Sequence, residues 1–130
     1  MKYLGIDFGA KRIGVALSDI EGRMAFPHSV MKNGSDIILR MKMLCDKEGV
    51  DRVIIGESLD RNNKENPIMK KIIPFKTALE EALGFPVLFH TEVLTSQEAK
   101  LIQGENAMHD ASAAAIILQS YIDRENNRLS

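Results

Sequence analysis

The stretch from Tyr3 to Asp19 restricts the fold of this chain more than any other part of the sequence. It predicts two apolar strands joined by a tight turn at residues 9–11. The residues up to Ile6 show no polar alternation, which is typical of a strand that is buried on both faces near the middle of a sheet. Asp7 follows directly, and an ionised carboxylate is costly to bury without a partner. Two interpretations of Asp7 stay open: a residue that caps the turn, or a ligand of a hydrolytic metal ion.

The following residues predict further strands separated by amphipathic segments. A third strand is expected over residues 23–31, where Pro27 lacks a hydrogen-bond donor and predicts a sheet edge or a bulge. Two more strands are expected over residues 50–56 and 87–90. Because a helix separates these strands from the preceding ones, parallel pairing with right-handed crossovers is expected.

Helical spacing predicts three helices in the positions between and after these strands. The first is expected to begin at the capping residue Ser35 and to stop at Gly49. The second is expected to begin at Asn66, with a kink or break before Pro74. The third covers residues 109–121, where small alanines predict close packing on the sheet, and the polar residues that follow it are expected to form an unorganised tail.

Composition limits the classes of function and compartment. The 130 residues fit one domain, 1–130, and contain no apolar run long enough to span a membrane. Cys45 is the only cysteine, so a disulfide within the chain is excluded and a reducing cytoplasm is expected. The net charge of −1 gives no surplus of cations. A nucleic-acid site must therefore be a local patch, since phosphate neutralisation drives such binding.

Three ordered motifs resemble the YqgF family of small ribonuclease H-like proteins, which is linked to Holliday-junction resolution and to 5′-end maturation of ribosomal RNA. The first motif runs over residues 5–19, the second over 91–99 and the third over 109–121. The second motif departs from the family pattern, because Thr91 replaces an acid and Val93 replaces an arginine. The segment between the second and third motifs is shorter than is usual and lacks the basic loop of the family.

The resemblance implies an α/β fold of the ribonuclease H-like type, with a five-stranded mixed sheet of order 3-2-1-4-5 and helices on both faces. It places Asp7, Glu92 and Asp110 at one end of this sheet. Three carboxylates suit Mg²⁺ or Mn²⁺, which prefer hard oxygen ligands. Two such ions can activate a water and stabilise the leaving oxygen of a phosphodiester.

Three further residues complete the predicted site. Lys11 and Arg12 in the first turn are candidates for holding a nucleic-acid backbone. Glu57 stands where relatives carry an apolar residue, directly after the fourth strand. Because this strand should lie beside the first one, Glu57 is expected about 5 Å from Asp7 and to share a metal ion with it as a fourth catalytic carboxylate. The alternative for Glu57 is a carboxylate that points away from Asp7 and caps the loop or the helix that follows it.

Two functions follow from this resemblance. The first is a metal-dependent endonuclease that acts on branched DNA or on a structured rRNA precursor, and the retained acids favour it. The second is a non-catalytic module that associates with RNA or ribosomal particles, and the missing arginine and basic loop favour that one. A monomer and a homodimer are both compatible with the sequence.

Overall fold

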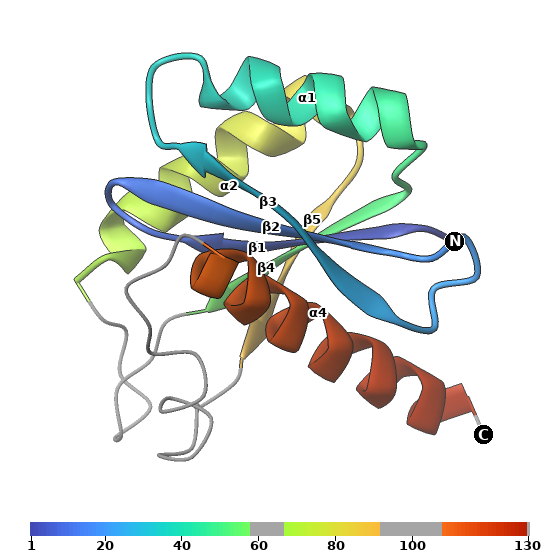
Figure 1. Cartoon of the computed structure of the whole chain (residues 1–130). Helices are drawn as coiled ribbons and strands as arrows, with labels where there is room; N and C mark the ends of the chain where they lie inside the picture. The colour runs from blue at the N-terminus through green and yellow to red at the C-terminus, as the bar shows by residue number, and fades with distance from the viewer. Residues whose placement is uncertain (58–66, 92–107, 130) are drawn as a thin grey trace.

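The computed structural model describes residues 1–57, 67–91 and 108–129, with side chains described for all of these except 108–110 and 129. The elements in chain order are β1 (Tyr3–Phe8), β2 (Arg12–Ser18), β3 (Ala25–Lys32), α1 (Ile37–Glu48), β4 (Arg52–Glu57), α2 (Met69–Leu83), β5 (Val87–Thr91) and α4 (Met108–Leu129) (Figure 1). Among these helices none is long and apolar enough to span a membrane.

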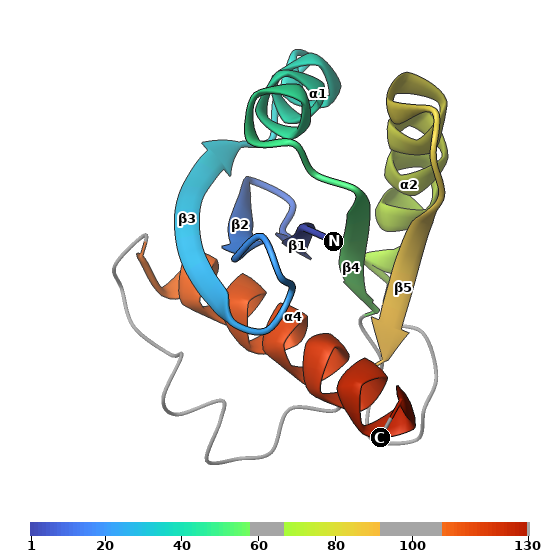
Figure 2. The same cartoon turned by 90° about the vertical axis from the view of Figure 1, so that its right-hand side faces the viewer.

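The strands form a five-stranded sheet in the order β3-β2-β1-β4-β5, as predicted. The apolar strand β1 lies in the centre, antiparallel to β2 and parallel to β4. Strand β5 is parallel to β4, so the carboxyl ends of β1, β4 and β5 all lie at the same end of the sheet. Helices α1 and α2 cover one face of the sheet, and α4 covers the other (Figure 2).

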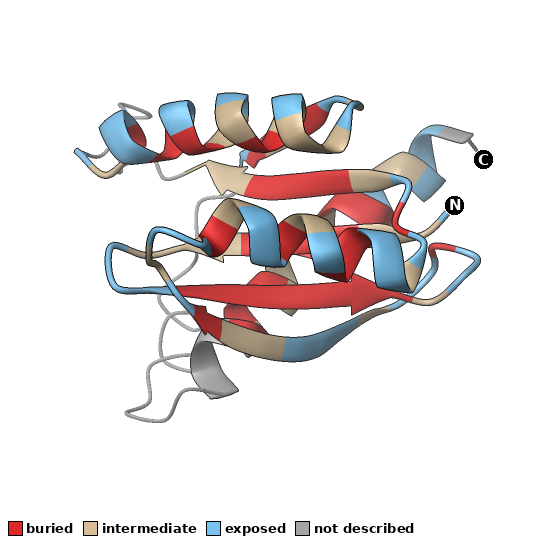
Figure 3. Cartoon of the chain, turned by 90° about the horizontal axis from the view of Figure 1, so that it is seen from above, coloured by how far each residue is buried: buried red, intermediate tan, exposed pale blue. Residues whose placement is uncertain are grey.

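Alternation along each strand divides the buried side chains between two cores. The core below α1 and α2 is the larger one, and its strand residues include Leu4, Ile6, Ile13, Val15, Val53 and Ile55. The core below α4 contains Ala16, Ile54, Ala114, Leu118, Tyr121 and Ile122. Figure 3 shows buried residues filling the middle of the inner strands β1, β2 and β4 and alternating with exposed ones along the covering helices.

The first core contains the cysteine of the chain, and the predicted end of α1 at Gly49 is confirmed. Cys45 is buried within this core, and burial raises the pKa of its thiol to about 12, so that the thiol is a filler of the core rather than a nucleophile. Gly49 ends α1 in the left-handed conformation at φ 67°. The predicted start of α1 is wrong, because the helix begins at Ile37 and its cap position is Asp36 rather than Ser35.

Helix α2 differs from its prediction at two points. It begins at Met69 rather than directly after Asn66, which lies outside the described residues. It also runs without a break through Pro74. A proline in the sixth position of a helix removes a single backbone hydrogen bond, and the buried side chains of Ile72 and Phe75 fix the helix to the core on either side of it.

The edge strand β3 has the features that Pro27 predicted. It pairs with β2 alone in the described sheet, and its register shifts between Ser29 and Pro27, so that His28 is the extra residue of a bulge. His28 is exposed, and its Nδ1 lies 2.9 Å from the Ser29 hydroxyl.

Helix α4 lies close against β1 at Gly5, which has no side chain. A Cβ on Gly5 would lie 2.7 Å from the Cβ of Leu118 and 3.0 Å from the carbonyl oxygen of Ala114. The rings of Tyr3 and Tyr121 meet edge to face with centroids 5.7 Å apart. The predicted close packing of the small residues is thereby confirmed.

The predicted polar tail is wrong, because α4 continues to Leu129. Burial of Ile122 carries the helix past the end of the predicted segment. Polar pairs at helical spacing follow on its outer side, including a hydrogen bond from Gln119 to Asp123 and an ion pair of Arg128 with Glu125. Such pairs stabilise an exposed helix by a few tenths of a kcal/mol each, about 0.2–0.5.

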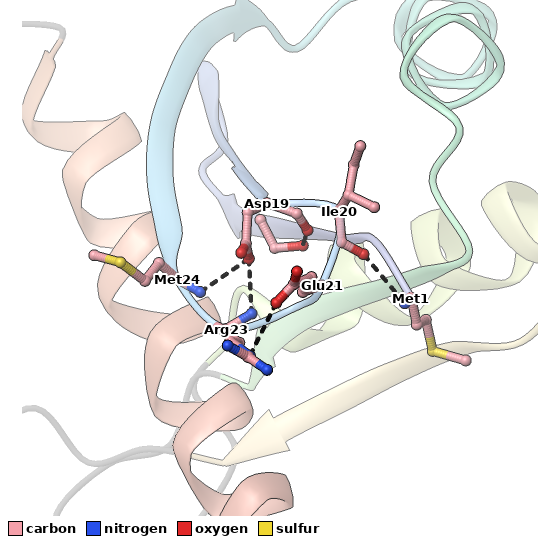
Figure 4. Close-up of polar contacts among 7 residues, drawn as sticks. Met1, Asp19, Ile20, Glu21, Arg23 and Met24 are labelled. Carbon is pink, nitrogen blue, oxygen red and sulfur yellow. Dashed lines mark hydrogen bonds and ion pairs between the residues drawn. The ribbon is translucent and has the colours of Figure 1, made fainter.

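The turn between β2 and β3 is closed by the carboxylate of Asp19 (Figure 4). Its Oδ1 accepts hydrogen bonds from the backbone N–H groups of Arg23, at 2.7 Å, and of Met24, at 3.1 Å. These bonds, the one from Met24 first, lower the pKa of Asp19 below its ordinary value of 3.8.

We expect Asp19→Asn to remove part of the acid dependence of stability. The carboxylate of the folded state has the lower pKa, so its contribution is complete above pH 3.8 and disappears as the pH falls through the folded pKa. The stability difference between wild type and Asp19→Asn, from urea unfolding between about pH 2 and pH 6, should therefore shrink toward the acid end. A difference that is constant with pH would contradict this role.

Candidate active site

Asp7 is half-buried near the end of the central strand β1. It pairs with Gly14 of β2, and the preceding residue, Ile6, pairs with Ile55 of β4. The carboxyl ends of β4 and β5 lie at the same end of the sheet as the carboxyl end of β1, and Glu57 pairs there with Thr91. Parallel strands bind ligands beyond such carboxyl ends. Asp7 thus lies at the end of the sheet that is formed by the carboxyl ends of the parallel strands, where a binding site is expected.

The turn that follows Asp7 has a backbone that requires glycine and is tied to a second segment. A Cβ on Gly9 would lie 2.5 Å from the carbonyl oxygen of Arg12. Asn33, directly after β3, donates from Nδ2 to the carbonyl oxygen of Gly9 at 3.0 Å and from its backbone N–H to that of Lys11 at 2.9 Å. Lys11 and Arg12 are exposed on this turn. The prediction missed Asn33, because only the pairing of β3 with β2 reveals what it contacts.

The alternation of side chains along the strands assigns Asp7 and Glu57 to opposite faces of the sheet. Ile6 and Phe8 pack with the core below α1 and α2, so Asp7 between them belongs to the α4 face. In β4 it is Gly56 that faces α4, because a Cβ there would lie 2.6 Å from Cδ1 of Ile117. Glu57 therefore follows on the opposite face. The strands are neighbours as predicted, but this alternation argues against an ion shared by Asp7 and Glu57.

The other two predicted carboxylates are only partly covered by the structure. Glu92 lies outside the described residues, and Asp110 is described by its backbone, in the first turn of α4. Helix α4 passes Gly5 at Leu118 and Tyr3 at Tyr121, so it runs opposite to β1. The first turn of α4 therefore lies toward the end of the sheet where β1 terminates, one residue after Asp7 (Figure 1). Among the described side chains, no three of His, Cys, Asp or Glu gather as metal ligands would.

His90, two residues before Glu92, packs against α4 and is not part of the candidate site. It is buried on β5 with its Nε2 2.9 Å from the hydroxyl of Ser120 and its ring edge to face with Tyr121. Burial lowers the pKa of His90, because it disfavours the charged imidazolium. The Tyr121 hydroxyl accepts a hydrogen bond of 2.7 Å from Arg52. These groups connect β4 and β5 to α4.

The sheet order, the acid on the central strand and the helix across the opposite face define a protein of the ribonuclease H-like class. Solved structures with this fold include RuvC of Thermus thermophilus, which is 18% identical with a TM-score of 0.66 over 98% of this chain and 97% of that one. Another is the fowlpox virus Holliday junction resolvase, which is 15% identical with a TM-score of 0.57 over 95% of this chain and 99% of that one.

Sequence comparison gives the particular family. The model of the RuvX family, described as Holliday junction resolvase, matches residues 1–124. A relative from Caldanaerobacter subterraneus subsp. tengcongensis is 34% identical over 98% of this chain and 99% of its own length, and one from Syntrophus aciditrophicus is 35% identical over 95% and 89%. Both carry the name "Putative pre-16S rRNA nuclease". The chain belongs to the RuvX family, which confirms the family that its motifs indicated.

Proposed function

We propose that this chain is a divalent-metal-dependent endonuclease that hydrolyses phosphodiester bonds in structured nucleic acid in the cytoplasm. Its substrate classes would be four-way DNA junctions, the 5′ end of a 16S rRNA precursor, or both. The observation that carries the proposal is the place of Asp7, half-buried on the central strand and beside an exposed cationic turn. Membership of the RuvX family supports the reaction class.

The donor set fits a hard cation. Asp7 offers carboxylate oxygens at the carboxyl edge of β1, and the proposed partners Glu92 and Asp110 are also carboxylates. Mg²⁺ or Mn²⁺ bound by these groups would lower the pKa of a bound water and neutralise charge at the leaving oxygen. In the reaction, the water oxygen forms a bond to phosphorus, the bond from phosphorus to the 3′-oxygen breaks, and the 3′-oxygen takes up a proton.

The chain's own cations position the substrate in this proposal. Lys11 and Arg12 would bind phosphates that flank the scissile bond, because they project from the turn directly after Asp7. A chain of net charge −1 provides no general attraction for nucleic acid, so such local contacts carry the affinity.

The test incubates the purified chain with Mn²⁺, and separately with Mg²⁺, on a four-way DNA junction and on a 16S rRNA precursor. Cleavage at defined positions that EDTA abolishes is the expected result. Intact substrates under all conditions would contradict the proposal.

A non-catalytic role on RNA or ribosomal particles is the second candidate. Thr91 and Val93 stand where the family pattern has an acid and an arginine, which favours a site that binds without cutting. This candidate predicts binding of the precursor RNA with no product under any metal condition.

Calorimetry can test whether Glu57 binds the metal ion together with the other carboxylates. If Glu57 binds the metal ion, Glu57→Gln should weaken Mn²⁺ binding at least as much as Glu92→Gln does. The pleat favours a smaller effect, because Gly56 rather than Glu57 faces α4 beside Asp7. Unchanged Mn²⁺ affinity in Glu57→Gln would remove Glu57 from the ligand set, and a loss equal to that of Glu92→Gln would place it there.

A further inference from the structure

Two neighbouring residues of α4 bind the two edge strands of the sheet. The side-chain oxygen of Gln119 accepts a hydrogen bond of 2.8 Å from the backbone N–H of Ala25, the first residue of β3. The side-chain nitrogen of Gln119 donates to the carbonyl oxygen of Arg23 at 3.1 Å. The hydroxyl of Ser120 lies 2.9 Å from Nε2 of His90 on β5. Because β3 and β5 are the outermost strands, α4 is attached across the full width of the sheet (Figure 2).

The next residue attaches the same turn of α4 to a third strand. The hydroxyl of Tyr121 accepts a hydrogen bond of 2.7 Å from Arg52, the first residue of β4. The ring of Tyr121 is buried and meets the rings of Tyr3 and His90 edge to face. Because hydrogen bonds require a particular distance and angle, the bonds of residues 119–121 form together at one position of α4 along the sheet. We call residues 119–121 the anchor segment.

The anchor segment helps to determine where the first turn of α4 lies. The buried residues of the first half of the helix are the alanines Ala111, Ala113 and Ala114. Apolar burial is non-directional, and such small side chains differ little from one position along the helix to the next. Asp110 precedes Gln119 by nine residues, which corresponds to about 14 Å along the helix axis. Because the helix is unbroken between them, a displacement of the anchor segment displaces Asp110 as well.

We propose that Gln119, Ser120 and Tyr121 are positioning residues, which fix α4 along the sheet and thereby hold Asp110 where it can bind a divalent cation together with Asp7. This inference rests on the proposed function, in which both acids bind that cation. It adds residues outside the site that control the affinity for the cation. Metal–ligand distances are fixed to within about 0.2 Å, and a misplacement of about 1 Å in an active site can cost about 100-fold in rate. An attachment that lies several turns away can therefore control the chemistry at the first turn of the helix.

The test measures Mn²⁺ binding by calorimetry, and cleavage of the four-way DNA junction and of the 16S rRNA precursor, for Gln119→Ala and Ser120→Ala. It uses conditions in which urea unfolding shows each variant to be folded. Each variant should bind Mn²⁺ about tenfold more weakly, at the lower end of the 10–100-fold loss that is typical of groups that orient metal ligands. The kcat should fall while the KM for the nucleic acid stays at the wild-type value, because the cations of the first turn are unchanged. Ser120→Thr keeps the hydroxyl and should restore both the Mn²⁺ affinity and the kcat.

Leu79→Val is the matched control, because Leu79 is fully buried on α2, in the core on the other face of the sheet. It should lower the stability in urea and leave the Mn²⁺ affinity unchanged. If Gln119→Ala and Ser120→Ala lose stability but bind Mn²⁺ as tightly as Leu79→Val does, the positioning role is overturned and the proposed function stands. Should Gln119→Ala fail to fold, Ser120→Ala decides alone.

The wild-type chain separates this inference from the proposed function. If the wild type neither binds Mn²⁺ nor cuts either substrate, both are overturned together. If it binds Mn²⁺ without cutting, the nuclease activity is overturned, and tenfold weaker Mn²⁺ binding by the variants of the anchor segment still supports their positioning role.

Discussion

Asp7→Asn should abolish metal-dependent cleavage while the folded structure persists. Asparagine keeps the shape of the side chain but removes the charge that a divalent cation requires. Residues that merely support a metal ligand already cost about 10–100-fold when they are changed, so loss of a ligand on the central strand should cost more than roughly 100-fold. Initial rates of cleavage on the better of the two substrates, with Mn²⁺ in excess, measure the effect.

Asp51→Asn provides the matched control for this variant. Asp51 precedes β4 at the opposite edge of the sheet, where its Oδ2 accepts a hydrogen bond from the backbone N–H of Lys2. It should cut at the wild-type rate, and both variants should unfold cooperatively. If Asp7→Asn cuts as fast as Asp51→Asn, the assignment of the active site is wrong.

The order of the sheet was predictable from the family resemblance, and features that are local in sequence support it. The unbroken apolar run that ends at Ile6 indicates a central strand, and Pro27 indicates an edge. The alternation of helix and strand after residue 36 requires parallel pairing. The family motifs then fixed which strands are neighbours, and the structure agrees at every pair.

The predicted site depended on distances between strands and left out the direction of the side chains. The strands that carry Asp7 and Glu57 are neighbours as predicted, but a shift of one residue in the alternation of side chains exchanges the two faces of a sheet. The register of Ile6 with Ile55 and the contact of Gly56 with Ile117 reveal that difference. Neither can be read from spacing along the chain.

Two predictions about helix ends were wrong because of contacts between distant segments. Ser35 has the chemistry of a helix cap, yet α1 starts two residues later, after the bend that carries Asn33 back to the turn at Gly9. The residues after Arg124 show no apolar period, yet they stay helical because Ile122 and Tyr121 fix the preceding turns against the sheet. Glu92 lies outside the described residues, so its predicted role stands as a prediction.

Gly5→Ala should destabilise the fold more than the same change at Gly56 of the neighbouring strand β4. The added Cβ would lie 2.7 Å from the Cβ of Leu118 and 3.0 Å from the carbonyl oxygen of Ala114. Both atoms are fixed to the backbone of α4, so no rotamer relieves the clash and the helix itself must move. Overpacking of this kind costs about 1–3 kcal/mol, which exceeds the roughly 0.4–1 kcal/mol gained by restricting the unfolded chain.

Gly56→Ala is the control for Gly5→Ala. It tests whether the loss of stability comes from the clash with α4 or from adding any side chain at a glycine of the sheet. Its Cβ would lie 2.6 Å from Cδ1 of Ile117, the far end of a flexible side chain, which can rotate away. Urea unfolding should therefore show a clearly larger loss of stability for Gly5→Ala than for Gly56→Ala. Equal losses would mean that α4 is not held by its close approach to β1. Because Asp110 lies in the first turn of that helix, a displacement forced at Gly5 should also lower cleavage under conditions in which Gly5→Ala is still folded.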